Sequence, residues 1–131
     1  MNGFEEVIGL KVVEASSARV VGEIEIEDRH RQPYGIVHGG VYCSMIETLA
    51  SYGAALWSTE QGWFGAVGLA NGTDFLRATR SGVITAEALP IHQGRSHQIW
   101  QVVVTRREDG KVAARDQVRL HNLVEMEDVK G

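Results

Sequence analysis

Six residues between positions 32 and 51 are of types that can act on a carbonyl group. They are Gln32, His38, Gly39, Gly40, Glu47 and Ser51. Two consecutive glycines directly ahead of a helix let the backbone approach a ligand closely, and the first helical turn presents free N–H groups at the positive end of the helix dipole. A helix start of this kind stabilises a developing oxyanion. The segment therefore indicates a reaction centre more than a scaffold.

Glu47 is the one charged residue of the helix that follows. From Val41 to Trp57 apolar residues occupy most of the helix circumference, a pattern typical of a buried helix. The remaining polar residues, at spacings of three and four, form a narrow stripe on one face: Ser44, Glu47, Thr48 and Ser51. The stripe can be the solvent face of an ordinary amphipathic helix, but it carries no Lys or Arg. We therefore expect Glu47 to be buried or half-buried and to be functional.

The other candidate residues also have purely structural explanations. Gln32 and His38 can bond backbone groups of a loop, which is the commoner role for a single residue of either type. Ser51 can donate to the helix carbonyl at position 47. Function is favoured by the joint spacing of these residues with Glu47.

Composition and charge limit the classes of function. With 131 residues, 44% of them hydrophobic, the chain can bury a core, and we expect one domain over residues 1–131. The formal net charge is −4, and no cluster of Lys and Arg exceeds a pair. A nucleic-acid partner is therefore not expected, because it requires a basic face.

Cysteine usage and the first ten residues bear on the compartment. Cys43 is the one cysteine, so neither a disulfide framework nor a cysteine zinc site is expected, and we predict no metal and no cofactor. The N-terminal sequence MNGFEEVIGL has acids where a signal peptide needs bases. Since no apolar run approaches the ~20 residues that span a bilayer, a cytoplasmic protein without a membrane partner is expected.

The rest of the sequence has the period of β-strands. Val20, Ile24 and Ile26 alternate with charged residues, as in a half-exposed strand. The expected strands are 18–28, 63–76, 82–93, 97–108 and 111–123, with turn signals at Ser81-Gly82, Gln93-Gly94 and Asp109-Gly110. Short turns imply that consecutive strands pair antiparallel. The pattern predicts an α+β fold, a curved antiparallel sheet of about five to six strands wrapped around one long central helix.

On these motifs the chain resembles the hotdog-fold thioesterases of the phenylacetic-acid-degradation type. Gln32 lies in RQPYGIVHGG, Glu47 follows His38 by nine residues, and Ser51 lies one turn further. LPIHQGRSHQIWQVVV resembles a hairpin segment of that family. The likeness runs from about Arg29 to about Leu120. It is greatest to the branch that contains the enterobactin-pathway proofreading thioesterase and the Arthrobacter-type 4-hydroxybenzoyl-CoA thioesterase.

The resemblance implies hydrolysis of an acyl-CoA thioester at a site shared between two subunits. The Gly40 amide would polarise the thioester carbonyl, while Glu47 would act as nucleophile or as general base. Gln32 and His38 would orient the thioester, and Ser51 would hold the attacking water or the Glu47 carboxylate. The assembly implied is a homodimer that pairs into a homotetramer.

The same resemblance suggests residues that bind the substrate. The candidates are Gly39 in the cradle, Asn71 with Thr73 and Asp74 beside the acyl pocket, and Arg77, Arg80, Arg95 and Ser96 for the anionic end of CoA. The arginines can equally be solvated surface residues, and Asp74 a turn or cap residue.

The sequence is compatible with several acyl groups and with two other functions. Aryl, hydroxybenzoyl-like and fatty acyl groups all remain candidates, because the aromatic residues suit a core as well as a pocket. A non-catalytic acyl-CoA binder or sensor would not need Glu47 and would usually carry a further domain. A hotdog dehydratase or hydratase is the other alternative, although the Asp-x-Asn-x-x-His hydratase motif is absent from the sequence.

Overall fold

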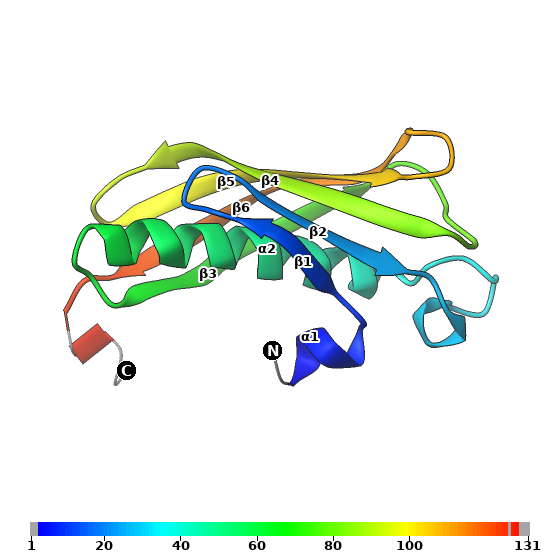
Figure 1. The fold of residues 1–131 in the computed structure, drawn as a ribbon, viewed down its shortest axis with the longest axis horizontal. Coiled ribbons are helices and arrows are strands. Elements are labelled where there is room, and N and C mark those ends of the chain that lie inside the picture. The colour runs from blue at the N-terminus through cyan, green and yellow to red at the C-terminus, as the bar shows by residue number, and fades with distance from the viewer. Residues whose placement is uncertain (1–2, 126, 129–131) are drawn as a thin grey trace.

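One antiparallel sheet and one long helix make up most of the molecule. The computed structural model describes residues 3–125 and 127–128. The elements are α1 (Phe4–Val7), β1 (Lys11–Ala15), β2 (Val20–Glu25), η1 (Asp28–His30), α2 (Gly39–Glu60), β3 (Gly65–Phe75), β4 (Val83–Gln93), β5 (His97–Arg106) and β6 (Val112–Leu123). The strand order is β1-β2-β4-β5-β6-β3, with every neighbouring pair antiparallel. Figure 1 shows the sheet curving over α2, so the predicted α+β architecture is confirmed.

The core lies between the sheet and one side of α2. The fully buried hydrophobic residues of the helix are Met45, Ile46, Leu49, Ala50 and Ala54. Gly53 lets the helix pass close over Trp100, since a Cβ at position 53 would lie 2.3 Å from the Trp100 ring. Glu47 and Leu56 of the same helix are exposed. The expectation of a helix buried on nearly all sides is therefore wrong for a single chain, because the sheet covers only one side of it.

The position of β3 also differs from the expectation. The turn signal at Ser81-Gly82 predicted that the strands expected at 63–76 and 82–93 pair with each other. Instead β3 pairs with β6, from Gly65 opposite Leu123 to Phe75 opposite Ala114. The intervening residues 76–82 are too many for a tight hairpin. This segment is instead hydrogen-bonded to the loop before α2, because Val37 N donates to Thr79 O at 2.8 Å.

The N-terminal segment packs beside the loop that leads into α2. The sequence pattern does not predict α1, and it leaves open whether one or two strands precede α2. Arg29 Nη1 donates to Val7 O at 2.7 Å, and the buried His30 ring contacts Ile8 O through Nε2, also at 2.7 Å. These contacts fix the end of α1 and the residue after it to η1, which precedes α2.

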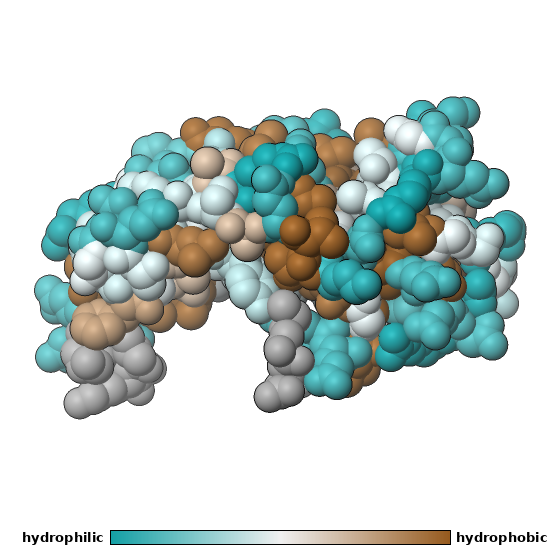
Figure 2. Space-filling model, viewed as in Figure 1, coloured by the Kyte–Doolittle hydropathy of each residue, from teal (hydrophilic) through white to brown (hydrophobic). Residues whose placement is uncertain are grey.

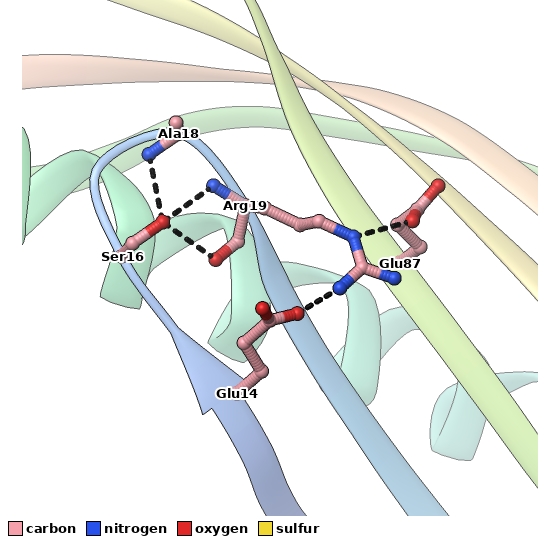
Figure 3. A network of polar contacts seen from close by, with 5 residues as sticks. All are labelled: Glu14, Ser16, Ala18, Arg19 and Glu87. Atoms are coloured by element: carbon pink, nitrogen blue, oxygen red, sulfur yellow. Dashed lines mark hydrogen bonds and ion pairs between the residues drawn. The ribbon is translucent and has the colours of Figure 1, made fainter.

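The turn between β1 and β2 is held by a polar network, shown in Figure 3. Ser16 Oγ accepts from Arg19 N at 3.0 Å and closes the turn. The Arg19 guanidinium then pairs with Glu14 on β1 and, at 2.7 Å, with Glu87 on β4. Exposed ion pairs of this kind contribute about 0–1 kcal/mol each, so their effect is to order the turn more than to stabilise the fold.

The edge strand β3 leaves hydrophobic side chains at the surface. Val67, Leu69 and Phe75 are 46%, 59% and 56% exposed. Hydrophobic groups also reach the surface in the middle of the face drawn in Figure 2. Among residues 3–125 and 127–128, no helix is both long enough and apolar enough to cross a membrane.

Candidate active site

The first turn of α2 is built around His38. Its extended backbone (φ −62°, ψ 135°) makes it the N-cap of the helix, and its Nδ1 accepts from Gly40 N at 2.8 Å. Because Nδ1 accepts, the proton of the neutral ring is assigned to Nε2. His38 is exposed, so Nε2 can donate to a ligand.

The two glycines at this helix start make room for rings of the same chain. A Cβ at Gly39 would lie 3.0 Å from the Phe75 ring, and a Cβ at Gly40 would lie 3.0 Å from His38 Nδ1. The amide of Gly40, predicted to bind an oxyanion, already donates to His38. A carbonyl oxygen bound at this amide must therefore share or replace the bond to His38.

Gln32 lines a cavity of about 300 Å³ beside the start of α2. Its other lining residues include Gly39, Tyr42, Phe75, Leu76 and Arg77. Gln32 Oε1 accepts from Tyr34 N, which leaves Nε2 to donate elsewhere. The Tyr42 and Phe75 rings lie 6.1 Å apart, centroid to centroid. The cavity thus combines an aromatic wall with an amide donor.

The buried phenol of Tyr42 closes this wall. Burial raises the pKa of Tyr42 above its usual value, against the smaller opposing effect of the hydrogen bond to Thr79. The phenol is therefore neutral at physiological pH and donates to Thr79 Oγ1 at 2.8 Å. Its hydrogen-bond partner is protein, so Tyr42 offers the cavity its ring rather than its hydroxyl.

Glu47 points from α2 toward β3. A Cβ at Gly68 would lie 3.5 Å from the Glu47 carboxyl carbon, and Glu47 Oε1 accepts from Asn71 Nδ2 at 3.4 Å. Within residues 3–125 and 127–128 it forms no ion pair. The side chain is exposed, so the prediction that it is buried or half-buried is wrong for the single chain.

A β-bulge brings Gly68 and Asn71 to the same side of β3. Gly68 lies opposite Leu120 and Ala70 opposite Arg119, so Leu69 is an extra residue in the strand. Side chains alternate along a strand, and an inserted residue reverses the alternation beyond it. Residues 68 and 71 therefore both face Glu47, although their separation is odd.

Two further cavities adjoin Glu47. One, of about 340 Å³, is lined by Glu5, Glu47, Thr48, Ser51 and Tyr52; the other, of about 200 Å³, by Phe4, Cys43, Ser44, Glu47, Thr48 and Asn71. Ser51 shares the first cavity with Glu47, as its predicted role requires. In the part of the chain that the structure describes, Ser44 bonds back to Gly40 O at 2.7 Å, whereas Ser51 Oγ makes no such bond.

A single chain does not bring all the predicted catalytic residues together. The cavity with Gln32 and Gly39 shares no lining residue with either cavity beside Glu47. Glu47 lies nine positions after His38 in the sequence, which corresponds to about 13 Å of helix rise. The structure therefore has two half-sites, with Gln32, His38, Gly39 and Gly40 in one and with Glu47, Ser51 and Asn71 in the other.

The predicted CoA-binding arginines also lie apart. Arg77 borders the Gln32 cavity, and Arg80 Nη1 donates to Tyr34 O at 3.3 Å in the same region. Arg95, in contrast, lies in the β4–β5 turn, 5.8 Å above the Trp63 ring, and with Ser96 it lines a cavity of about 570 Å³. Trp63 lies three residues after Glu60, the last residue of α2, so Arg95 and Ser96 lie at the opposite end of this helix from His38.

Several residues beside Glu47 were not identified from the sequence. Phe4 and Glu5 reach it from α1, a helix that had no periodic signal. Asp116 is buried beneath Asn71 and Thr73. This last residue had a signal: in the predicted strand 111–123 it interrupts an alternating row of apolar residues, between Ala114 and Val118.

A comparison with protein families decides what kind of enzyme this fold represents. Residues 34–113 match the model of the thioesterase superfamily. The chain belongs to that superfamily. The predicted hotdog fold and the prediction of a thioester-hydrolysing enzyme are thereby confirmed.

Individual members of the superfamily are similar over most of their length. The protein Rv1847 of Mycobacterium tuberculosis is 41% identical over 92% of this chain and 86% of its own, and its solved structure superposes with a TM-score of 0.88. The 1,4-dihydroxy-2-naphthoyl-CoA hydrolase of Listeria monocytogenes is 35% identical over 79% of this chain and 82% of its own. The proofreading thioesterase EntH of Klebsiella pneumoniae is 32% identical over 74% and 69%.

Proposed function

We propose that this thioesterase hydrolyses acyl-CoA thioesters, and aryl-CoA thioesters in particular. The observation that carries the proposal is the exposed carboxylate of Glu47, which forms no ion pair among residues 3–125 and 127–128. It lies beside Gly68 and borders two cavities. Support for an aryl group comes from the aromatic wall of Tyr42 and Phe75 and from the Listeria relative, which is named for an aryl-CoA substrate.

The complete site is assembled from two chains. The β3 edge is 11 residues long, hydrogen-bonded on one side and partly apolar. An edge of this kind is suited to antiparallel pairing with a second copy. Since α2 packs over β3, such pairing brings the Glu47 half-site of one chain toward the half-site of His38 and Gln32 in the other. Further pairing of dimers would give the homotetramer.

Within this composite site each group has a defined task. His38 Nε2 and the Gln32 amide donate to the thioester carbonyl, and the Gly40 amide joins them once the carbonyl displaces its bond to His38. Together with the helix dipole they stabilise the tetrahedral oxyanion, and removal of one such donor typically costs ~10²–10³ in rate. The donors come from one chain and the carboxylate from the other, as the separation of the half-sites requires.

Two chemical routes are compatible with Glu47. As general base it takes a proton from water, the hydroxide adds to the carbonyl carbon, and collapse of the oxyanion breaks the C–S bond while the proton passes to the thiolate. As nucleophile its own oxygen adds, CoA thiolate leaves, and water then hydrolyses the mixed anhydride. Ser51 holds the water in either route. Label found in Glu47 after a single turnover in ¹⁸O-labelled water would establish the anhydride route, because only attack of water on the Glu47 carbon of an anhydride places solvent oxygen there.

Arg77 and Arg80 are the cations best placed for the phosphates of CoA. Both adjoin the loop of Gln32, and charge-assisted bonds from guanidinium to phosphate are strong. Arg95 and Ser96 lie at the far end of α2 in the same chain, so they contact CoA only if the partner chain brings them near. Asn71 and Gly39 contact the acyl end.

The decisive test is the release of CoA thiol from a panel of benzoyl-, hydroxybenzoyl- and fatty acyl-CoAs by wild type, Glu47→Ala and Glu47→Gln. The proposal expects turnover by wild type, highest for aryl-CoA, and a loss of ~10² or more in both variants. Circular dichroism and thermal melting establish that the variants are folded. Full activity in Glu47→Gln would refute the role of Glu47, and inactivity of wild type on the whole panel would refute the substrate class.

A further inference from the structure

Asp116 is a carboxyl group inside the protein with no cation beside it. It is 2% exposed, and its neighbours on the inward face of β6, Ala114, Val118 and Leu120, are fully buried. Among residues 3–125 and 127–128 it takes part in no ion pair. The charged group that acts on it is Asp74 on β3, another acid. A charged Asp116 would therefore be a buried anion close to a second anion.

A chain of hydrogen-bond contacts leads from Asp116 to Glu47. Asp116 Oδ2 lies 2.9 Å from Thr73 Oγ1, and Thr73 Oγ1 lies 3.0 Å from Asn71 Oδ1. Asn71 Nδ2 donates to Cys43 O at 3.1 Å and to Glu47 Oε1 at 3.4 Å. The chain ends at the carboxylate to which we assign the catalytic role.

The orientation of Asn71 limits where the protons can lie. Cys43 O can only accept and the Glu47 carboxylate also accepts, so Asn71 Nδ2 must face both and Oδ1 must face Thr73. The Thr73 hydroxyl thus lies between two acceptors, Asn71 Oδ1 and Asp116 Oδ2, and has a single proton to donate. If Asp116 is ionised, one of these two contacts lacks a hydrogen. If Asp116 is protonated and donates to Thr73, Thr73 donates to Asn71 and both contacts have one.

The surroundings of Asp116 are consistent with this count. Burial raises the pKa of Asp116 above its usual value, and the charge of Asp74 acts in the same direction. Donation from Thr73 lowers the pKa and is the largest of the opposing effects, but it is absent when the Thr73 proton goes to Asn71. The backbone amides of Gly72 and Gln117 lower the pKa as well, and Gly72 N donates to Oδ1 at 3.2 Å, the oxygen that does not carry the proton.

We propose that Asp116 is a neutral carboxylic acid and a positioning residue for Glu47. Its proton sets the direction of the whole chain: Asp116 donates to Thr73, Thr73 donates to Asn71, and Asn71 donates to Glu47. Loss of that proton would turn the Thr73 hydroxyl toward Asp116 and leave Asn71 Oδ1 without a donor, so that Asn71 no longer holds Glu47. The effect of this chain on catalysis by Glu47 rests on the proposed function, whereas the protonation of Asp116 does not.

Two substitutions at position 116 separate a neutral acid from an anion. An asparagine can donate from Nδ2 to Thr73 and accept from Gly72 N, so it reproduces the protonated acid, whereas alanine removes the donor. We expect Asp116→Asn to keep kcat near wild type and Asp116→Ala to lower kcat by about tenfold or more with little change in KM. Thr73→Val should lower kcat similarly, since it breaks the chain at the next link.

Protonation is measured without reference to activity. In ¹³C-aspartate-labelled protein the carboxyl resonance missing from Asp116→Asn is that of Asp116, and we expect it at the position of a protonated acid at neutral pH. An ionised Asp116 at neutral pH, or a folded Asp116→Asn as slow as Asp116→Ala, would overturn the proposal. If wild type hydrolyses no acyl-CoA, the proposed function fails, and the resonance still decides the state of Asp116.

Discussion

The carboxyl group of Glu47 lies directly over Gly68, so close that a Cβ at position 68 would come within 3.5 Å of its carboxyl carbon. This contact depends on the bulge at Leu69, which places Gly68 and Asn71 on the same side of β3. The strand thus places a residue without a side chain beside Glu47 and a hydrogen-bond donor three residues later. In the proposed function a thioester or an attacking water reaches the carboxylate over Gly68.

A side chain at position 68 should obstruct this approach to Glu47. We expect Gly68→Val to lower kcat/KM for acyl-CoA by about tenfold or more, because it crowds the carboxylate and its substrate. Gly72→Val is the matched control, since Gly72 lies on the same strand and a Cβ there meets nothing within 4 Å. Steady-state kinetics of the two variants test the claim. Equal losses in both would show that the strand, and not the space beside Glu47, is sensitive.

His38 is expected to have two separable functions. As N-cap it stabilises α2, and in the proposed function its ring donates to the substrate from Nε2. Asparagine also caps helices, so His38→Asn should retain most of the stability but lose ~10²-fold in kcat, whereas His38→Ala should lose in addition about 1 kcal/mol of unfolding free energy. Denaturant melts and kinetics on the same samples give both quantities. Wild-type kcat in His38→Asn would restrict the residue to capping.

Sequence patterns are most informative where one face of an element meets the core. They locate the long helix and the strands corresponding to β2–β6, because alternation or a helical period marks burial on one side. They do not predict the pairing of β3 with β6, because the register of a strand depends on partners far away in the sequence and residues 76–82 give only a local turn signal. α1 has four residues, too few to show a period.

In the candidate site, too, residue types and spacing are predictable from the sequence, whereas contacts between elements are not. The types and spacing of Gln32, His38 and Glu47 are enough to indicate carbonyl chemistry. That Gly40 donates to His38, and that Asn71 reaches Glu47 through a bulge, depends on distances of a few ångströms that spacing does not encode. Asp116 is recognisable as an acid on an apolar face, but its route to Glu47 runs through β3, and the sequence pattern places that strand beside a different partner.

The stability of the protein should report the raised pKa of Asp116. A folded state that holds this proton more tightly than the unfolded chain loses stability as the pH rises above the ordinary value of 3.8, until the pH passes the folded-state pKa. Asp116→Asn has no such proton to lose. The unfolding free energy of Asp116→Asn minus that of wild type should therefore increase from about pH 4 upward and then level off. Urea melts at a series of pH values test this, and a difference independent of pH would contradict it.

The close contact between Gly53 and Trp100 predicts that alanine at position 53 destabilises the protein, whereas helix propensity alone predicts that it stabilises the protein. Alanine in place of glycine normally stabilises a helix by about 1 kcal/mol. At position 53 the new Cβ would lie 2.3 Å from the fully buried Trp100 ring, and overpacking of this kind costs about 1–3 kcal/mol. Gly53→Ala should therefore lower the melting temperature, and Trp100→Phe should recover part of the loss in the double variant. A rise in melting temperature for Gly53→Ala alone would be the contrary result.

The separation of His38 from Glu47 along α2 predicts complementation between two inactive variants. Glu47→Gln removes the carboxylate and His38→Asn removes the carbonyl donor, so neither assembly should turn over acyl-CoA. The two variants are co-expressed with different affinity tags, and assemblies that contain both variants are isolated through the two tags in succession. In each mixed dimer one site contains both substitutions and the other site contains neither. The mixed assembly should regain about a quarter to a half of wild-type activity.

Glu47→Gln carrying the two tags is the control and should stay inactive. If the mixed assembly is inactive too, His38 and Glu47 act within one chain, and the half-sites must close by a movement of α2 instead of by pairing through β3.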